Sequence, residues 1–267
     1  MNKEQIISRY LSSLDIDNEI SDIEDITKLI EAHLRTFPFS SLKVLLKEDI
    51  SLELKDIYEN IVVRKRGGYC YEHNKLLYEV LNYLGFAVEY YLARVINNTD
   101  SMVPQTHRFT ILNFDDKRYL IDVGIGFRSP NAPIKFGKEL TSCYLGNYCI
   151  KEFDDKTFAM QLIQNDKPFI VTKFDLNRCY EVDFTLGHFY SHKNPEAVFV
   201  NNLVVSLIEN DVIYSLVNKN YLKIYKDRTE KVEINTLEQF QEILENDLNS
   251  DFNFDEILFL FERYIKV

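Results

Sequence analysis

The pattern of apolar and polar positions predicts that the first third of the chain is helical. Over residues 3–13 and 23–35, apolar side chains recur every three or four positions, as on the buried face of a helix. Residues 52–63 have the same pattern, and so does the segment that begins at Cys70. This last helix should end at Gly85, because glycine is a common C-terminal cap.

After this glycine the pattern is typical of strands. β-branched and aromatic residues become frequent, and short apolar runs are separated by turn-forming residues. Two neighbouring runs, 106–114 and 118–123, predict a hairpin that turns at Asp115 and Asp116. The region from about 86 to 190 should therefore form an antiparallel sheet or barrel. Its other predicted strands cover 87–96, 144–153, 157–163 and 169–174.

The last part of the chain mixes both patterns. Predicted strands at 212–217 and 221–225 are followed by predicted helices at 237–248 and 254–264. At 267 residues the chain is long enough for two or three domains. The residues thus predict an α+β protein in which a helical part, a β part and a mixed part follow one another.

Composition and charge limit the possible partners. A hydrophobic content of 46% and a charged content of 27% are typical of a globular protein. The net charge of −11 argues against nucleic acid or an anionic membrane as the main partner, although Arg64, Lys65 and Arg66 form a basic cluster for an anionic substrate. No apolar run reaches transmembrane length, and the first residues do not resemble a signal peptide, so we expect a cytoplasmic protein.

The four cysteines form neither a zinc-binding nor a disulfide pattern, so we expect no metal. Cys143, Cys149 and Cys179 lie in apolar or aromatic surroundings and are predicted to be core residues. Cys70 differs, because it follows two glycines and begins a helix. There, unpaired N–H groups and the helix dipole favour the nucleophilic thiolate. The alternative is that Cys70 is a small core residue beside a turn.

A nucleophilic cysteine needs a base, and the base needs an orienting group. His33 lies within a predicted helix and is expected to be a partly buried residue with satisfied hydrogen bonds. His73 lies three residues beyond Cys70, but no acidic residue is placed to hold it. His107 is the better candidate, because it opens a strand whose hairpin partner ends in Asp122.

The hairpin register tests whether His107 and Asp122 can meet. If Asp115 and Asp116 form a two-residue turn, the numbers of facing residues sum to 231, and His107 and Asp122 are diagonal neighbours on one face. A turn longer by one residue would put them on opposite faces. Asp122 is flanked by apolar residues, so it should be buried and should need a partner. Local backbone donors are the alternative partner.

Three motifs contain these residues. Residues 66–74 read RGGYCYEHN, residues 104–109 read PQTHRF and residues 122–127 read DVGIGF. In order and spacing the motifs resemble those of the arylamine N-acetyltransferase family. The resemblance covers nearly the whole chain and is strongest from 60 to 135.

The resemblance implies a three-domain α+β fold. A helical bundle (1–85) would carry the nucleophile, an antiparallel β-barrel (86–190) would carry the histidine and the aspartate, and an α/β lid (191–267) would follow. The first two domains would resemble papain-like thiol hydrolases in their triad. Cys70, His107 and Asp122 would be the catalytic residues.

The implied reaction is a ping-pong transfer of an acetyl group. Acetyl-CoA is the implied acyl donor, and a small aromatic amine or hydrazine is the implied acceptor, with a thioester of the cysteine as the intermediate. The implied donor contacts are Gly124, Gly126, Phe127 and Arg128. The implied acceptor contacts are Phe39, Val95, Ile125 and Phe199.

Three departures from the family pattern concern the surroundings of the triad. Ile125 replaces a phenylalanine of the acceptor pocket, and His188 replaces a common asparagine. Ser40 and Ser41 replace the acidic and amide residues that usually follow Pro-Phe, which leaves Arg66 without its habitual partner. The acceptor, the acyl-chain preference and the oligomeric state stay open.

Other functions fit parts of the sequence. The same triad could form an amide from a larger, carrier-bound acyl chain, or act as a thiol peptidase. A non-catalytic binding module that keeps the fold is the alternative from a different class.

Overall fold

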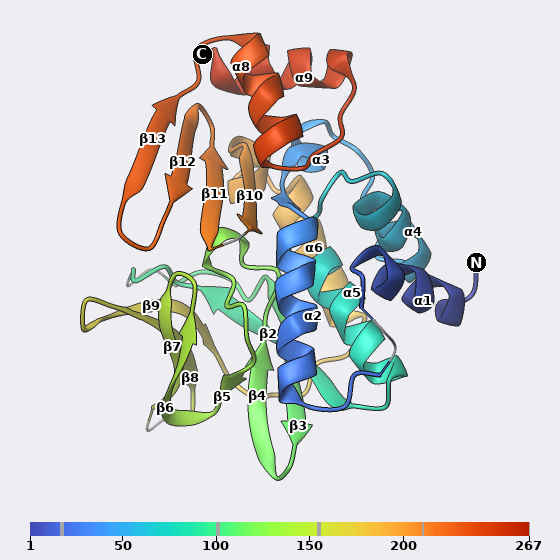
Figure 1. Cartoon of the computed structure of the whole chain (residues 1–267), viewed down its shortest axis with the longest axis vertical. Coiled ribbons are helices and arrows are strands. Elements are labelled where there is room, and N and C mark those ends of the chain that lie inside the picture. Colours follow the sequence, from blue (N-terminus) through green and yellow to red (C-terminus); the bar gives the residue numbers. More distant parts are fainter. Residues whose placement is uncertain (17–18, 100–101, 154–155, 210, 267) are drawn as a thin grey trace.

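The computed structural model describes residues 1–16, 19–99, 102–153, 156–209 and 211–266. Its N-terminal part is helical and confirms the predicted helices (Figure 1). The short helix α3 and the two-residue strand β1 were not predicted, because neither is long enough to show a period. The elements are α1 (Lys3–Ser13), α2 (Ile23–Thr36), β1 (Phe39–Ser40), α3 (Leu42–Leu45), α4 (Leu54–Tyr58) continued by the π-helical turn η1 (Glu59–Val63), and α5 (Cys70–Tyr83).

The central part of the chain is an antiparallel sheet of eight strands in the order β5-β4-β3-β2-β9-β8-β7-β6. An isolated bridge joins Phe136, which follows the end strand β5, to Ile150 of β7, the strand next to the other end, so the sheet nearly closes into the predicted barrel. The strands are β2 (Ala87–Val95), β3 (His107–Phe114), β4 (Lys117–Ile121), β5 (Ile134–Lys135), β6 (Gly137–Cys143), β7 (Gly146–Glu152), β8 (Phe158–Gln164) and β9 (Lys167–Phe174).

The prediction of the barrel missed two of its strands. β5 has only two residues, and β6 is largely exposed and lacks an apolar face. The six predicted strands of this region are confirmed with small shifts at their ends. The barrel interior is filled by side chains of several strands, among them Phe109, Met160 and Val171.

A second sheet of five strands forms the C-terminal part, in the order β1-β10-β11-β12-β13. Its edge strand β1 comes from the N-terminal part of the chain. Figure 1 shows the C-terminal helices above this sheet. The elements are β10 (Val204–Glu209), β11 (Val212–Val217), β12 (Asn220–Ile224), β13 (Thr229–Glu233), α8 (Leu237–Glu242) continued by η3 (Ile243–Asp247), and α9 (Phe254–Leu260) continued by η4 (Phe261–Ile265).

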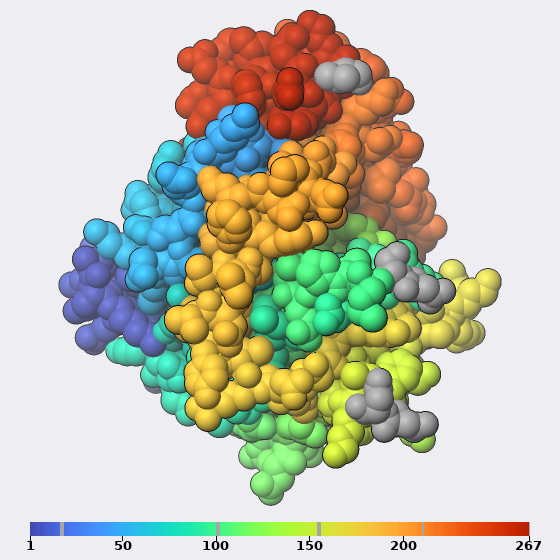
Figure 2. All heavy atoms as spheres, turned by 180° about the vertical axis from the view of Figure 1, so that it is seen from behind, coloured from blue at the N-terminus to red at the C-terminus, as the bar shows by residue number. Residues whose placement is uncertain are grey.

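Two helices lie between the barrel strands and the second sheet in the sequence, α6 (Asp183–Lys193) and α7 (Val198–Asn201). Figure 2 shows this part of the chain as a gold strap across one face of the molecule. The sequence did not predict α6, because its apolar residues point to both sides: Phe184 is buried, whereas Leu186 and Phe189 are exposed. The fold class is confirmed, whereas the domain limits at residues 85 and 190 stay predictions.

Within the described ranges, no helix is both long and apolar enough to cross a bilayer.

Candidate active site

Two glycines shape the loop that precedes Cys70. Gly67 has a φ of +67°, and a Cβ there would lie 2.4 Å from the carbonyl oxygen of Pro38. A Cβ on Gly68 would lie 2.9 Å from a carboxylate oxygen of Glu72. That carboxylate accepts hydrogen bonds from the Tyr69 N–H (3.2 Å) and from Nζ of Lys43 (2.7 Å). The loop is therefore packed closely against Pro38 on one side and Glu72 on the other. It places Cys70 as the first residue of α5.

The hairpin of β3 and β4 has the predicted register. Thr110 faces Ile121 and Phe114 faces Lys117, so the facing numbers sum to 231. Asp115 and Asp116 form the two-residue turn with φ values of 48° and 57°, as a type I′ turn requires. His107 and Asp122 consequently meet, although Asp122 lies just beyond the last residue of β4.

The Asp122 carboxylate is buried, and both of its oxygens have hydrogen-bond partners. Its Oδ2 lies 2.6 Å from Nε2 of His107. Its Oδ1 accepts hydrogen bonds from Nδ2 of Asn74 (2.8 Å) and from the Gly124 N–H (3.0 Å). Both predicted kinds of partner are therefore present, the imidazole and a local backbone donor.

Asn74 also belongs to the candidate site, although the sequence did not predict it. Its side chain accepts a hydrogen bond from the Val123 N–H (2.9 Å) and donates to Asp122 and to the carbonyl of Arg108 (2.6 Å). The available signal was its place as the last residue of RGGYCYEHN, one helical turn beyond Cys70 and on the same face of α5.

His107 is a strong base in this setting. Burial opposes its charged form, but the negative charge of Asp122 and hydrogen bonds with Asp122 and Cys70 raise the pKa of His107 to about 10. Nε2 is occupied by Asp122, so Nδ1 is the nitrogen left for the thiol. The raised pKa of His107 favours a proton on its imidazole. Sγ of Cys70 also lies 3.7 Å from the carbonyl oxygen of Thr106.

Both ring nitrogens of His73 have other partners, so His107 stays the better candidate for the base. Its Nε2–H donates to the carbonyl of Pro38 (3.1 Å), and its Nδ1 accepts from Nε2 of His33 (2.8 Å). His33 in turn accepts from the hydroxyl of Tyr10 (2.8 Å). His33 is therefore satisfied as predicted, but it is completely buried instead of partly buried.

This buried pair should make the protein sensitive to acid. Burial lowers the pKa of His73 to about 4 and that of His33 well below its usual value. The unfolded chain then binds more protons than the folded one below about pH 6.5, so stability is lost as the pH falls from about 6.5 to about 4. For His73 alone the loss should reach roughly 3 kcal/mol. Urea unfolding across this pH range measures it.

The variant His73→Gln is the matched control for the acid effect. Glutamine keeps a donor for the Pro38 carbonyl and does not titrate. Its free energy of unfolding should depend less steeply on pH between 6.5 and 4 than that of the wild type. Equal slopes for the two proteins would contradict the assignment.

A cavity of about 420 Å³ opens beside Cys70 and His107. A Cβ on Gly124 would lie 2.7 Å from Cα of Cys70 and from Nδ2 of Asn74, so this wall requires a glycine. All eight predicted donor and acceptor contacts line this cavity: Phe39, Val95, Gly124, Ile125, Gly126, Phe127, Arg128 and Phe199.

The prediction from the sequence did not include other parts of the cavity wall. Tyr190 and Ser191 line it from α6, a helix that the pattern did not predict. Thr106 and Val103 line it from the segment before β3. Residue types alone gave no signal for Val103, Tyr190 and Ser191, whereas Thr106 lies within the motif PQTHRF.

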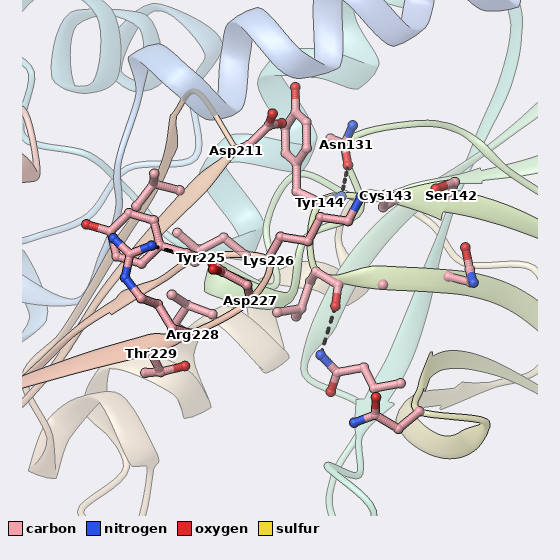
Figure 3. A pocket seen from close by; sticks show the side chains of 18 of the residues that line it. Asn131, Ser142, Cys143, Tyr144, Asp211, Tyr225, Lys226, Asp227, Arg228 and Thr229 are labelled. Atoms are coloured by element: carbon pink, nitrogen blue, oxygen red, sulfur yellow. Dashed lines mark hydrogen bonds and ion pairs between the residues drawn. The ribbon is translucent and has the colours of Figure 1, made fainter.

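A larger groove lies elsewhere, between the turns of the barrel and those of the second sheet. Its volume is about 1200 Å³, and Figure 3 shows Tyr144, Asp211, Tyr225 and Lys226 around it. None of the predicted site residues lines this groove. The larger groove therefore does not coincide with the predicted site.

Arg66 has partners that the sequence did not predict. Its guanidinium donates two hydrogen bonds to the carboxylate of Glu256 (2.9 and 3.0 Å) and another to Glu48, and it lies 4.3 Å from the ring centre of Phe252. Arg66 thus has no partner at positions 40 and 41, and Glu48 and the α9 residue Glu256, from the far end of the chain, pair with it instead. Since Arg66 is buried and paired, it does not serve as a surface cation for a substrate.

In the part of the chain that the structure describes, no group of three or more His, Cys, Asp or Glu side chains could hold a metal ion.

Comparisons with known proteins agree on one family. The sequence model of a family described as N-acetyltransferase matches residues 22–257. An arylamine N-acetyltransferase from Mycolicibacterium smegmatis is 30% identical over 251 residues, which are 91% of this chain and 90% of that protein. These matches define a transferase. The chain belongs to the arylamine N-acetyltransferase family.

Solved structures support the fold. The arylamine N-acetyltransferase from Salmonella typhimurium has a TM-score of 0.90 at 24% identity, with 96% of this chain and 98% of that chain covered. The enzyme from Mycobacterium marinum in complex with CoA has a TM-score of 0.90 at 22% identity, with 97% and 99% covered.

Proposed function

We propose that this enzyme transfers an acetyl group from acetyl-CoA, through a thioester of Cys70, to an arylamine, an arylhydrazine or a related small amine. The observation that carries the proposal is the arrangement of three side chains. Cys70 and His107 face one cavity, and Asp122 holds the far nitrogen of His107 at 2.6 Å. This arrangement fits nucleophilic catalysis by a thiolate.

In the first half of the reaction the acetyl group moves to the enzyme. The proton of the Cys70 thiol passes to Nδ1 of His107, and the thiolate attacks the carbonyl carbon of the acetyl thioester. The new C–S bond forms, the bond to the CoA sulfur breaks, and His107 returns the proton to the leaving CoA thiolate. Asp122 stabilises the imidazolium throughout. The N–H of Cys70, which has no carbonyl partner within α5, is the proposed donor to the oxyanion.

In the second half the amine takes the acetyl group. Its nitrogen attacks the carbonyl carbon of acetyl-Cys70 while His107 accepts a proton from the nitrogen. The C–S bond breaks and Cys70 is restored. The family name and the names of its relatives support an aromatic amine as acceptor.

The proposed acceptor contacts form an apolar wall. The rings of Phe39 and Phe199 lie 5.7 Å apart, and Val95 lines the same cavity. Ile125 offers no aromatic face, so it cannot contribute the roughly 0.5–1.5 kcal/mol that ring stacking adds to area burial. The Phe39 and Phe199 rings are therefore the proposed contact for the ring of the acceptor.

The proposed donor contacts lie in the segment that follows Asp122. CoA as donor is supported by the related Mycobacterium marinum structure, which contains it. Gly124 and Gly126 line the cavity with backbone alone, so no side chain of theirs stands between the ligand and the main chain. Arg128 stacks on Phe127 and Phe169, at 4.2 and 4.8 Å, and lines the cavity. In a protein of net charge −11, it would supply a local cation for phosphate groups.

The alternatives fit these observations less well. Membership of a family of transferases argues against a non-catalytic binding module. A cavity of about 420 Å³ suits a small acceptor better than a carrier-bound chain that closes into a large ring. A cytoplasmic location and a lack of nucleic-acid or membrane partners stay predictions from the sequence.

Mass spectrometry of the intact protein tests the proposal. Incubation with acetyl-CoA should add one acetyl group, and an arylamine or arylhydrazine should then remove it as the N-acetyl product. Cys70→Ala should carry no adduct, whereas Cys149→Ser is the matched control and should behave like the wild type. If wild-type Cys70 reacts with iodoacetamide but never gains an acetyl group from acetyl-CoA, the proposal is wrong.

A further inference from the structure

α6 contacts both neighbours of the nucleophile. Gly187 lies against the hydroxyl of Tyr71, so closely that a Cβ there would be 2.0 Å from it. His188 accepts a hydrogen bond from the hydroxyl of Tyr69 and stacks on its ring, with the centres 5.8 Å apart. Tyr69 and Tyr71 flank Cys70 in the sequence. A shift of this helix would therefore move both residues next to Cys70.

Arg108 connects the same helix to the strand that carries His107. Arg108 follows His107 in β3 and is completely buried. Its guanidinium carbon lies 4.3 Å from the ring centre of Phe184 in α6. The rings of Tyr78 and Tyr90 also face it, at 5.7 and 5.2 Å. The guanidinium thus sits in an aromatic cage formed by these three rings.

The polar contacts of Arg108 extend to both sides of the cage. Its Nη1 donates to Glu181, at 3.0 Å, two residues before α6 begins. Nζ of Lys75 lies 2.6 Å from the same carboxylate oxygen. The backbone carbonyl of Arg108 accepts from Asn74, which also donates to Asp122. One residue is therefore bonded to the segment entering α6 and to the support of the triad.

Stability alone does not explain a guanidinium at this place. Nε and Nη2 of Arg108 have no hydrogen-bond partner among the residues that the structure describes. Buried donors without partners are costly, and apolar side chains of similar volume often replace a buried ionic group without loss. A methionine would fill the aromatic cage but could not bind Glu181.

We propose that Arg108 is a positioning residue, which fixes the strand of His107 to α6 and so sets the alignment of His107 with Cys70. The inference rests on the proposed roles of His107 and Cys70. It adds a residue that touches neither the substrate nor the reacting atoms. It also gives a role to Glu181, whose side chain is 42% exposed and does not line the cavity.

The pH dependence of Cys70 alkylation by iodoacetamide tests this role. In Arg108→Met the imidazole should no longer be aligned to take the thiol proton, and the reaction should follow an ordinary thiol. At pH 7 the alkylation rate should then fall by about 30-fold, since a thiol with a pKa of about 8.5 is mostly protonated there. A residue that only stabilises the fold would lower the melting temperature and leave the pH profile of the folded protein unchanged.

Rescue of the alkylation rate by small molecules distinguishes a positioning role of Arg108 from a general loss of stability. In Arg108→Ala, guanidinium at concentrations far below those that unfold proteins should restore part of the alkylation rate. Ammonium, which is charged but not planar, and urea, which is planar but neutral, should not. Arg118→Met is the matched control, because Arg118 also lies over a ring, that of Phe136 at 5.0 Å, but is exposed on β4.

A folded Arg108→Met with the wild-type pH profile would overturn the inference. If this variant does not fold, the Glu181→Ala variant provides the test. A pH profile of alkylation shifted toward that of an ordinary thiol supports the inference, and an unchanged profile overturns it. Alkylation requires no acetyl-CoA, so these outcomes are independent of whether Cys70 becomes acetylated. An acetylated wild type with unaffected variants would reject this inference and keep the proposed function.

Discussion

Asp122→Asn is expected to lower the rate of acetyl transfer by about 10⁴-fold, the effect of the same change in triads of the serine type. The hydrogen bonds of Asp122 give the reason. Its Oδ1 accepts from Asn74 and from the Gly124 N–H, so the single oxygen of an asparagine must stay there. The amide NH₂ then faces Nε2 of His107, which has to accept a hydrogen bond and leaves its proton on Nδ1. A protonated Nδ1 cannot take the proton of the thiol.

Two measurements check this expectation. The rate of acetyl-Cys70 formation from acetyl-CoA should fall, and alkylation by iodoacetamide at pH 7 should drop by about 30-fold as His107 ceases to hold the thiol proton. Asp116→Asn is the matched control, since it makes the same change in the turn of the same hairpin. Asparagine tolerates the φ of 57° at this position, so this variant should react like the wild type. A folded Asp122→Asn protein with wild-type rates would refute the role of Asp122.

The arrangement of Cys70, His107 and Asp122 could be predicted because it depends on short-range rules. The step from His107 to Asp122 is one hairpin, and a two-residue turn fixes its register. The position of Cys70 follows from two glycines and the start of an apolar helical face. These signals are local, so the sequence contains them without knowledge of the tertiary structure.

The rest of the site depends on contacts between distant parts of the chain. The carboxylate that binds Arg66 is 190 positions away in the sequence, and no pattern identifies Glu256 as its partner. α6 escaped prediction because its exposed Leu186 and Phe189 hide the apolar period of its buried face. Because α6 was not predicted, its cavity-lining residues Tyr190 and Ser191 were not predicted either. The same holds for its contact with Arg108.

Gly187→Ala is expected to destabilise the protein, although alanine is normally the better helix former. The new Cβ would lie 2.0 Å from the Tyr71 hydroxyl and 3.2 Å from Cζ of the same ring. Overpacking of this kind costs about 1–3 kcal/mol, more than the roughly 1 kcal/mol by which alanine exceeds glycine in a helix. α6 must shift, and the cavity wall at Tyr190 and Ser191 shifts with it. The KM for the amine should therefore rise more than the rate of Cys70 alkylation falls.

Tyr71→Phe should rescue the Gly187→Ala variant. The Tyr71 hydroxyl is buried and has no hydrogen-bond partner among the described residues, so its removal alone should be neutral or stabilising by about 1 kcal/mol. In the double variant the closest contact is gone, and the coupling energy from urea unfolding of the four proteins should be about 2 kcal/mol. Tyr69→Phe is the matched control: Tyr69 also flanks Cys70 and contacts α6, but its hydroxyl binds His188 and is not among the three atoms nearest a Cβ at position 187. Equal rescue by both phenylalanine variants, or by neither, would show that the Tyr71 hydroxyl is not what requires a glycine at position 187.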